Sequence, residues 1–585
     1  VPIVPGTTEA VASLEDAKTI AEEIGYPIAV KAAGGGGGKG FRVAMTPEDL
    51  QDAYEGASRE GEKFFSDPRV YVERIDITGN TTTRDKVIRR EFRLNEGDAF
   101  NALKVKRSQD RIQSLGFFQD KLEVKQTQVA PDRVALGLDV EEKSTGQLSL
   151  SAGYSSLERF IISANVEQSN FRGLGQVLSA GVNYSRYSKS IQLGFTEPYL
   201  FDKNILLGGN IFRRDYNSFN FVGNKRNTTY SQTSTGGGFT LGFPMTEYVS
   251  LGTRYSLVQD NITLDKSTFF RDPDLVLDAE GDVISDGPEP LQCSPQLAGQ
   301  YLCDELGKRI TSSVGYSVIY NDTNGIHPTR GQTLVVSQDF AGLGGDVRYI
   351  RSRATGTKYW GVLGGSWILS AHGEGGYIYP LEKAPGPGRD AIRITDRFFG
   401  TQLRGFDIRG IGPRILREDY DEEGNIVPDD RNRVSDALGG RAYYMGRIEL
   451  EFPTSSTLKS FGLRPSAFVD VGSVWGLRKP AIADFLKFCS AANQPTLAIS
   501  GSAENTSCEQ FNVNGVTGYA DDDAHSSPGF RERFVGNSPK PRLSVGVGVN
   551  WVSPFGPLRI DLAKAILKQE GDDTKLFSFN VGTQF

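Results

Sequence analysis

The last residues of the chain, Lys575 to Phe585, alternate apolar with polar side chains and stop on an aromatic residue. The apolar side chains fall at every second position, at Phe577, Phe579, Val581 and Phe585. This spacing indicates a strand with one apolar face, because successive side chains of a strand point to opposite sides. A strand that ends a chain has no partner downstream. We therefore expect it to pair with a strand far back in the sequence, as happens when a sheet closes into a barrel.

The same alternation precedes this segment in RLSVGVGVNW, residues 542–551. One face of the segment is apolar and carries Leu543, Val545, Val547, Val549 and Trp551. Beyond Arg542, the other face consists of Ser, Gly and Asn. A succession of strands with one apolar face and one polar, glycine-rich face is the sequence signature of a transmembrane β-barrel. No stretch contains the roughly 18–20 uninterrupted apolar residues that a membrane-spanning helix needs.

We count about sixteen strand-like segments after Gly146, each at least as long as the roughly 9–11 residues of a tilted spanning strand. Long polar insertions near 261–307, 382–439 and 476–540 alternate with short turns. Short turns on one side and long loops on the other are typical of outer-membrane barrels. The sequence thus predicts a mainly β chain, in which residues 144–585 form an antiparallel transmembrane barrel of about sixteen strands.

Two shorter regions precede the predicted barrel. Residues 71–143 are rich in charge and follow the pattern strand, helix, helix, strand, strand. Residues 1–70 alternate helix and strand patterns around a run of glycines. We therefore expect three domains, namely a short α/β segment at 1–70, a small βααββ domain at 71–143 and the barrel at 144–585.

The βααββ order, together with GNTTTRDKVIRREF and SLGFF, resembles a POTRA domain. Three further motifs resemble the barrel of the outer-membrane protein assembly factors of the BamA family. They are the Arg-Gly-Phe loop in LRGFDIRGIGP, the strand AFVDVGSVW, and the closing strands WVSPFGPLRIDLA and FSFNVGTQF. The motifs occur in the order that the family has. The resemblance covers about residues 70–585 and is greatest to the last POTRA domain joined to its barrel.

This resemblance implies a protein without enzymatic activity that folds and inserts β-barrel precursors into the bacterial outer membrane. Insertion would use a lateral seam between the first and last barrel strands, with the POTRA domain in the periplasm. The implied partners are unfolded barrel precursors, assembly lipoproteins on the periplasmic side and membrane lipid. The net charge of −7 argues against a nucleic-acid partner, and we expect no cofactor. A TamA-like factor or a two-partner secretion transporter of the same superfamily is the alternative.

A locking role is implied by the resemblance for three loop residues, Arg404, Gly405 and Phe406. A guanidinium group inside a partly dry barrel needs an acidic partner, because an unpaired buried charge is costly. The candidate partners are Glu451 in RIELEF and Asp470 in FVDVG. Alternation places Glu451 on the inner face of its strand. Asp470 shares a face with Phe468, so its side stays ambiguous unless the interior accepts an aromatic ring.

The seam is the second feature that the resemblance implies. Its predicted residues are Leu148 and Leu150 in the first strand and Phe577, Phe579, Val581, Gly582 and Phe585 in the last. Gly582 weakens the last strand, because glycine neither packs nor resists bending. An incompletely paired seam exposes backbone N–H and C=O groups, which form a template for an incoming strand.

The cysteines lie in the long insertions as two local pairs, Cys293 with Cys303 and Cys489 with Cys508. Passage through an oxidising periplasm would convert each pair into a disulfide. Four free thiols are the alternative. The histidines, His327, His372 and His525, show no ligand spacing, so we expect no metal site.

Three further charged residues carry expectations of their own. Glu91 in RREF matches a family position near the contact with an assembly lipoprotein, and an ordinary surface carboxylate on a helix is the alternative. Arg409 and Arg414, which follow the Arg-Gly-Phe motif, are expected to be solvated.

The first seventy or so residues resemble a different family, the ATP-grasp lobe of biotin carboxylase, through VPIVPGT and IAEEIGYPIAVKAAGGGGGKGFRV. The resemblance implies that Lys31 contacts a nucleotide phosphate and that Gly36 and Gly37 fold over it. A glycine-rich loop suits this task because its backbone N–H groups can approach phosphate. The carboxylates for Mg²⁺ and the biotin pocket belong to parts of that enzyme which the chain lacks. We therefore expect a vestigial site in a chimera or fusion, and an ATP-binding carboxylase fragment is the alternative.

Overall fold

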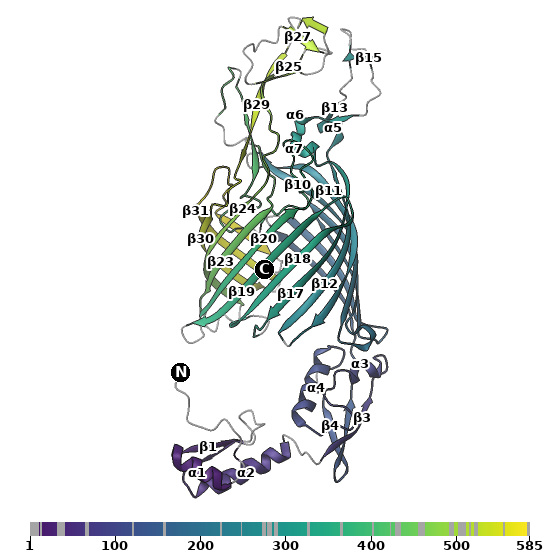
Figure 1. Cartoon of the computed structure of the whole chain (residues 1–585), viewed down its shortest axis with the longest axis vertical. Helices are drawn as coiled ribbons and strands as arrows, with labels where there is room; N and C mark the ends of the chain where they lie inside the picture. Colours follow the sequence, from purple (N-terminus) through teal and green to yellow (C-terminus); the bar gives the residue numbers. More distant parts are fainter. Residues whose placement is uncertain are drawn as a thin grey trace. The chain divides into compact units, whose positions relative to one another are not determined.

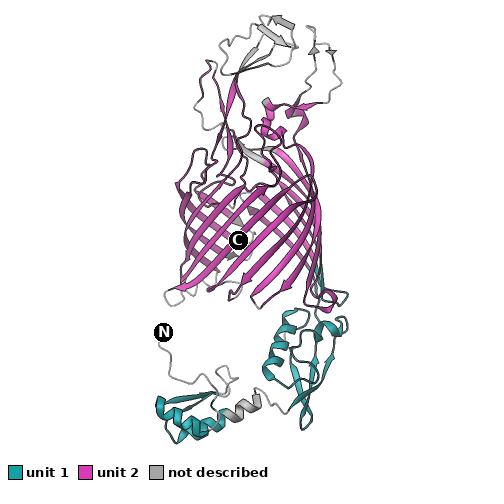
Figure 2. Cartoon of the chain, viewed as in Figure 1, with its two compact units in different colours: residues 1–147, 167–178 teal, residues 148–166, 179–585 magenta. Residues whose placement is uncertain are grey.

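The structure is a computed structural model of the 585-residue chain. It describes residues 11, 14–31, 41–64, 70–119, 122–155, 159–222, 225–246, 248–271, 276–277, 283–285, 291–324, 328–362, 367–400, 403–421, 423–427, 434–453, 462–490, 497–500, 510–513, 516–519, 525–553 and 556–581. The chain divides into two compact units (Figure 2). The first comprises residues 1–147 and 167–178, and the second comprises residues 148–166 and 179–585.

The first unit begins with a small α/β segment. Its elements are α1 (Leu14–Ile24), β1 (Ile28–Lys31), β2 (Phe41–Ala44) and α2 (Asp49–Phe64). β1 and β2 pair antiparallel. The buried side chains between the helices and this hairpin are Ala21, Ala44, Leu50 and Ala53. Three of these four are alanine, so the segment buries little apolar area from which to draw stability.

The first unit continues with the βααββ order that the sequence predicts. Its elements are β3 (Tyr71–Thr78), α3 (Asp85–Arg89), α4 (Ala102–Ser114), β4 (Val124–Ala130) and β5 (Arg133–Asp139). The sheet order is β3-β5-β4, with β3 parallel to β5 and β4 antiparallel to it. Val87 and Ile88 of α3 and Ile112 of α4 pack with Leu136 of β5 in one core. The side chain of Asn101 caps α4 by accepting a hydrogen bond from the Lys104 amide.

Among the described residues, sixteen strands form one antiparallel sheet that curls into a barrel (Figure 1). They are β6 (Gly146–Ser155), β7 (Arg159–Phe171), β8 (Gln176–Ser185), β9 (Ser188–Glu197), β10 (Leu206–Val222), β11 (Lys225–Pro244), β12 (Val249–Thr263), β17 (Gly307–Asn321), β18 (Gly331–Gly345), β19 (Tyr349–Val362), β20 (Trp367–Pro380), β23 (Ala442–Glu451), β24 (Leu463–Trp475), β30 (Arg542–Ser553), β31 (Gly556–Leu567) and β32 (Phe577–Val581). The predicted fold class is confirmed by this sheet and by the preceding βααββ unit.

The two faces of the barrel strands differ as the alternation predicts. Ile448 of β23, Val547 of β30 and Leu562 of β31 are exposed on the outside. By contrast, Asp470 of β24 and Asp561 of β31 are buried on the inner face. This arrangement is the reverse of a water-soluble sheet and suits a lipid environment outside the barrel. No helix in the described part of the chain is long and apolar enough to cross a membrane.

The first and last strands meet at a seam. β32 pairs antiparallel with β31 over its whole described length, with Val581 opposite Leu558 at one end and Phe577 opposite Leu562 at the other. In the described residues, its pairing with β6 consists of one residue pair, Val581 with Tyr154. The last strand therefore meets the first strand, as predicted.

The long connections carry further elements beyond the barrel strands. They are η1 (Leu200–Asp202), α5 (Lys266–Phe269), β13 (Phe270–Arg271), β14 (Val276–Leu277), β15 (Val283–Ser285), β16 (Gln292–Cys293), α6 (Pro295–Ala298), α7 (Gln300–Cys303), β21 (Arg414–Asp419), β22 (Val434–Ala437), β25 (Asp484–Ser490), β26 (Leu497–Ser500), β27 (Gln510–Val513), β28 (Val516–Tyr519) and β29 (His525–Val535). A disulfide joins Cys293 to Cys303, which confirms the prediction for this pair. Cys508 and the side chain of Cys489 lie outside the described part of the chain.

Candidate functional site inside the barrel

Residues 403–413, which we call the lumenal loop, lead into β21 and pack against the inner face of the barrel. The side chains of Leu403, Phe406 and Ile411 are buried together with Met445 of β23 and Val474 of β24. These contacts cover the inner wall that β23 and β24 form. The loop is thus seated by apolar packing as well as by polar contacts.

Gly405 adopts a left-handed backbone conformation, with φ +87°. A Cβ atom at this position would lie 3.0 Å from Cβ of Ser544 on β30. Glycine is the residue that tolerates both the conformation and the close approach to the wall. The motif therefore needs glycine here so that its arginine can reach the neighbouring strands.

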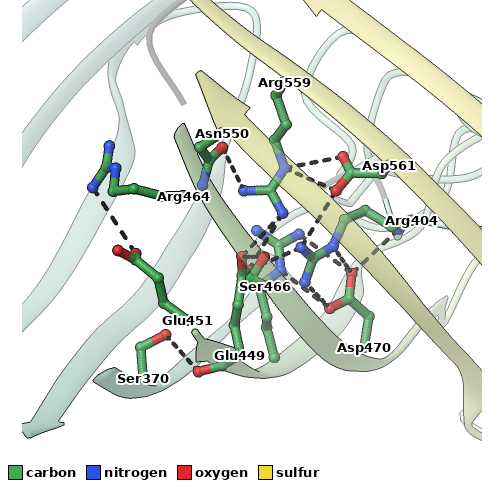
Figure 3. A network of polar contacts seen from close by, with 11 residues as sticks. Ser370, Arg404, Glu449, Glu451, Arg464, Ser466, Asp470, Asn550, Arg559 and Asp561 are labelled. Carbon is green, nitrogen blue, oxygen red and sulfur yellow. Dashed lines mark hydrogen bonds and ion pairs between the residues drawn. The ribbon is translucent and has the colours of Figure 1, made fainter. Parts of the chain in front are cut away.

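Arg404 contacts two carboxylates on the inner wall (Figure 3). Its side chain donates to Asp470 through Nε at 2.9 Å and through Nη2 at 2.6 Å. Nη1 donates to Oε2 of Glu449 at 2.9 Å. Arg404 is 6% exposed and Asp470 is 0% exposed, so both charges have left bulk water. Such a paired fork is the geometry in which an arginine–carboxylate contact is strong and directional.

Further charges join these residues in what we call the lumenal network. Its members are Arg404, Arg447, Arg559, Glu449, Asp470 and Asp561. Arg447 donates to Asp470 at 3.1 Å, and Arg559 bridges Asp561 at 3.0 Å and Glu449 at 3.1 Å. The three guanidinium groups and three carboxylates balance in charge. Balance of this kind offsets the cost of removing charged groups from water.

Phe468 lies beneath Arg404. The guanidinium carbon stands 3.2 Å from the centroid of the Phe468 ring. Phe468 and Asp470 are both buried on the inner face of β24, so the interior does accept an aromatic ring. The ambiguity of strand parity at Asp470 is therefore resolved in favour of an inward carboxylate. The stacking also orients the guanidinium plane toward Asp470 and Glu449.

The acidic partner on β23 differs from the predicted one. Glu451 forms an ion pair with Arg464 at 3.9 Å, whereas the contact with Arg404 falls to Glu449. Both glutamates share the inner face of β23, as alternation predicts. Glu449 pairs in register with Phe468, the residue beneath Arg404, while Glu451 lies two residues further along the ladder, opposite Ser466. The depth of the loop thus selects Glu449, and the expectation for Glu451 is corrected.

Arg414 is not solvated, which corrects a second expectation, and Arg409 is partly buried. Arg414 is 1% exposed and pairs with Asp573, and Ser435 accepts a further hydrogen bond from it. Arg409 lies over the ring of Phe399 at 4.2 Å from its centroid. Arg414 is buried and Arg409 is partly buried because the lumenal loop folds into the barrel.

A cavity of about 260 Å³ lies beside the loop. It is lined by Tyr216 of β10, Phe399, Gly400, Leu403 and residues 406–411. The loop therefore leaves space between itself and β10, the strand on the far side of the cavity.

The predicted seam residues lie as follows. Leu148 and Leu150 of β6 and Phe577 of β32 point outward and are exposed, Leu150 by 74%. Phe579 is partly buried, and Val581 faces Tyr154 across the seam. Gly582 and Phe585 lie outside the described residues.

Glu91 does not present its carboxylate to solvent. It is 4% exposed and forms an ion pair with Arg111 of α4 inside the first unit. Arg90 adds a second cation at 3.8 Å. α3 ends at Arg89, so Glu91 follows the helix and turns inward rather than lying on its outer face. The alternative of an ordinary surface carboxylate is therefore wrong, and the position near a lipoprotein contact stays a prediction.

The last predicted positions are those of the nucleotide site in the first segment. Lys31 is exposed at the end of β1, and Gly36 and Gly37 lie outside the described residues. Within the described part of the chain, no group of His, Cys, Asp and Glu residues could hold a metal ion.

Three family models match the chain. The model described as Omp85 superfamily domain matches residues 170–585. The POTRA model, described as surface antigen variable number repeat, matches residues 70–143. The model described as carbamoyl-phosphate synthase L chain, ATP binding domain, matches residues 1–88.

Individual relatives also match different parts of the chain, BamA proteins over most of it and carboxylases over a short segment. An outer membrane protein assembly factor BamA of Neorickettsia risticii is 28% identical over 515 residues, which cover 88% of this chain and 55% of that protein. The chain thus spans about half the length of the curated BamA relatives that it matches most extensively. A pyruvate carboxylase of Staphylococcus aureus is 47% identical over 73 residues, 12% of this chain and 6% of that enzyme.

Among solved structures, BamA from Haemophilus ducreyi lacking POTRA domains 1–3 matches with a TM-score of 0.57 and 23% identity. The match covers 88% of this chain and 85% of that one. At this identity the likeness concerns the fold, and it agrees with the POTRA-plus-barrel architecture described above.

Proposed function

The chain belongs to the Omp85 superfamily, and on this premise we propose that it folds and inserts β-barrel precursors into a bacterial outer membrane. The seam between β6 and β32 carries the proposal. The described pair, Val581 with Tyr154, places the first and last strands side by side, and edges freed by opening this seam could pair with another strand. A precursor strand that enters lipid must have its N–H and C=O groups paired, and a seam edge supplies partners without chemistry.

The lumenal network supports this mechanism from the wall next to the seam, because its strand β31 pairs with β32. Arg404 joins Asp470 of β24 to Glu449 of β23, and Arg559 joins Glu449 to Asp561 of β31. Charges held in this way resist separation, because removing one partner from a buried pair costs about 3–5 kcal/mol. We propose that β23, β24 and β31 stay joined in this way while β6 separates from β32. We propose Arg404, Gly405 and Phe406 as the lock that keeps the loop on that wall.

The proposed function also implies an orientation of the chain in the membrane. We propose that the POTRA unit faces the periplasm and that the long connections face the exterior. The Cys293–Cys303 disulfide in one of these connections supports exposure to an oxidising compartment. Barrel precursors, membrane lipid and assembly lipoproteins on the periplasmic side are the proposed partners.

We propose no enzymatic activity for the chain. The carboxylase-like match is confined to its first part, residues 1–88, and overlaps the POTRA match. Titration calorimetry of the full chain with Mg²⁺ and ATP tests this. We expect no binding heat above dilution, and saturable binding that the Lys31→Ala variant abolishes would contradict the proposal.

The insertion proposal is tested with the full chain in vesicles of phosphatidylethanolamine and phosphatidylglycerol. An outer-membrane barrel precursor is diluted from urea into the vesicles, and folding is followed by heat-modifiable gel mobility. We expect faster folding than in vesicles without the chain. Equal rates in both would contradict the proposal, and transport of a soluble protein across the vesicle wall without precursor folding would favour a secretion transporter.

The seam is tested by a reversible staple. Tyr154→Cys with Val581→Cys joins β6 to β32, and we expect its oxidation to stop precursor folding and reduction to restore it. Val469→Cys with Val545→Cys is the matched control, because these positions already pair between β24 and β30. Full activity of the oxidised seam variant would show that insertion does not use this seam.

A further inference from the structure

The connection between β31 and β32, residues 568–576, is bonded to the lumenal loop through its backbone. The Asp407 amide donates to the Asp573 carbonyl at 2.9 Å, and the Asp573 amide donates to the Gly410 carbonyl at 2.8 Å. The Lys575 amide donates to the Gly405 carbonyl at 3.1 Å. The loop and this connection thus form a short ladder outside the named strands.

Side chains reinforce the ladder on both of its sides. The Asp573 carboxylate accepts from the buried Arg414 and also from Ser435, the latter at 3.2 Å. Lys575 adds a weaker contact to Asp407 at 3.7 Å. Arg414 directly follows the lumenal loop, which ends at residue 413. Among the described carboxylates of this connection, Asp573 is the one that pairs with this arginine.

A second buried pair anchors the same connection to the barrel wall. Arg542, at the start of β30, donates to Asp572 at 3.1 Å and 3.3 Å, and both side chains are fully buried. This pair does not touch the lumenal loop. It fixes the connection to β30, whereas Asp573 fixes it to the loop.

These contacts lie next to the start of β32, the strand that borders the seam. β32 starts at Phe577, two residues after Lys575, and it is the strand that faces β6. Gly405 adjoins Arg404, the residue at the centre of the lumenal network. One short stretch of loop therefore binds the inner wall through Arg404 and the start of the last strand through Gly405. The start of β32 is held at several points, while its described contact with β6 is one pair.

We propose that Asp573 is a positioning residue that couples the lumenal loop to the seam. In this arrangement β32 is hinged at its start, and displacement of the loop releases the strand that borders the seam. The use of this coupling in insertion rests on the proposed function. The coupling itself is a property of the barrel and needs no precursor. A purely structural role for Asp573 would stabilise Arg414 locally and leave β32 unaffected.

The test measures hydrogen exchange in the full chain in vesicles, comparing Asp573→Asn with wild type. We expect exchange to rise about tenfold at the amides of residues 573 and 575 and also through 577–581, because loss of a charge-assisted contact lets the connection open. The matched control is Glu570→Gln, in the same connection, whose exposed carboxylate pairs with Arg533. We expect the control to leave β32 unchanged.

A second readout is the rate at which oxidised cysteines at positions 154 and 581 join across the seam. We expect this rate to change at least about threefold in the Asp573→Asn background and not in the Glu570→Gln background, because a less constrained strand samples other registers. Asp573→Glu, which keeps the charge, should move both readouts back toward wild type. Faster exchange at 573 and 575 with unchanged β32 exchange and unchanged crosslinking would overturn the coupling.

A folding failure of Asp573→Asn would not leave the inference untested. Lys575→Ala removes a partly exposed side chain from the same ladder, and it should accelerate exchange of 577–581 to a smaller extent. No effect on β32 from this variant would count against the hinge. Because neither readout uses a precursor, their failure is distinguishable from failure of the insertion assay.

Discussion

Arg404 holds Asp470 with its backbone as well as with its side chain. The Arg404 amide donates to Oδ2 of Asp470 at 3.3 Å, and Nε and Nη2 complete a fork to the same carboxylate. The carboxylate thereby fixes both the position of the loop and the orientation of its guanidinium group. A lysine could supply the charge but not this planar fork.

Replacing Arg404 with alanine should release the lumenal loop while the barrel still folds. Asp470 keeps Arg447, so we expect a cost toward the lower end of the about 3–5 kcal/mol for breaking a buried pair. Trypsin reports the release, because cleavage sites remain at Arg409 in the loop and at Arg414 directly after it. We expect faster cleavage there and slower precursor folding, with Arg404→Lys intermediate.

The matched control for this prediction is Arg464→Ala. Its side chain is partly exposed and stands 3.9 Å from Glu451, a contact worth about 0–1 kcal/mol. Heat-modifiable mobility should be normal in both variants. Unchanged trypsin cleavage and full activity in Arg404→Ala would argue against the lock.

The identity of the β23 partner gives a second prediction. Glu449→Gln should loosen the loop, because it removes a charge that faces both Arg404 and Arg559. A charge-assisted hydrogen bond is worth about 1.5–3 kcal/mol, so loop cleavage by trypsin should accelerate about tenfold or more. Glu451→Gln on the same face of the strand should change cleavage less than about threefold. The reverse order of effects would restore Glu451 as the partner.

The sequence predicts the strands well because their period of two is a local property. In RLSVGVGVNW each apolar side chain can be assigned to the outer face without knowledge of any neighbour, and Val547 is indeed exposed outward. The link between Arg404 and Asp470 could also be anticipated, because a buried guanidinium needs a carboxylate and the motif resemblance points to one.

Glu449 could not be chosen over Glu451 from sequence, because both occupy the same face of β23. The choice depends on the register between β23 and β24 and on how deep the loop sits, and neither is a local property. The burial of Arg414 is not predictable from sequence for a similar reason. Its partner Asp573 lies 159 residues later, in a connection that carries no pattern of its own.

Gly405 supplies a third prediction. Gly405→Ala places a Cβ atom 3.0 Å from Ser544 and forces a left-handed conformation on alanine. The conformation alone costs about 1–2 kcal/mol, so we expect a loosened loop with faster trypsin cleavage. Gly373→Ala on β20 is the control, since a Cβ there meets no atom within 4 Å. Equal cleavage of the two variants would mean that Gly405 is not required for docking.

The last prediction concerns Glu142, which closes the βααββ unit onto the turn before α3. Its carboxylate accepts from Thr81 Oγ1 at 2.8 Å and from the amides of Thr82 at 2.8 Å and Thr83 at 2.6 Å. Burial opposes ionisation, but these hydrogen bonds, foremost those from Thr83, lower the pKa of Glu142 to about 2. A lowered pKa stabilises the folded turn above the unfolded value of about 4.3, and this contribution is lost as pH falls toward 2. Exchange at the Thr82 and Thr83 amides, corrected for intrinsic rates, should therefore accelerate between pH 4 and pH 2 in wild type. Glu142→Gln should exchange faster already at neutral pH and show no such acid-dependent rise, and an identical pH profile in the two proteins would contradict the assignment.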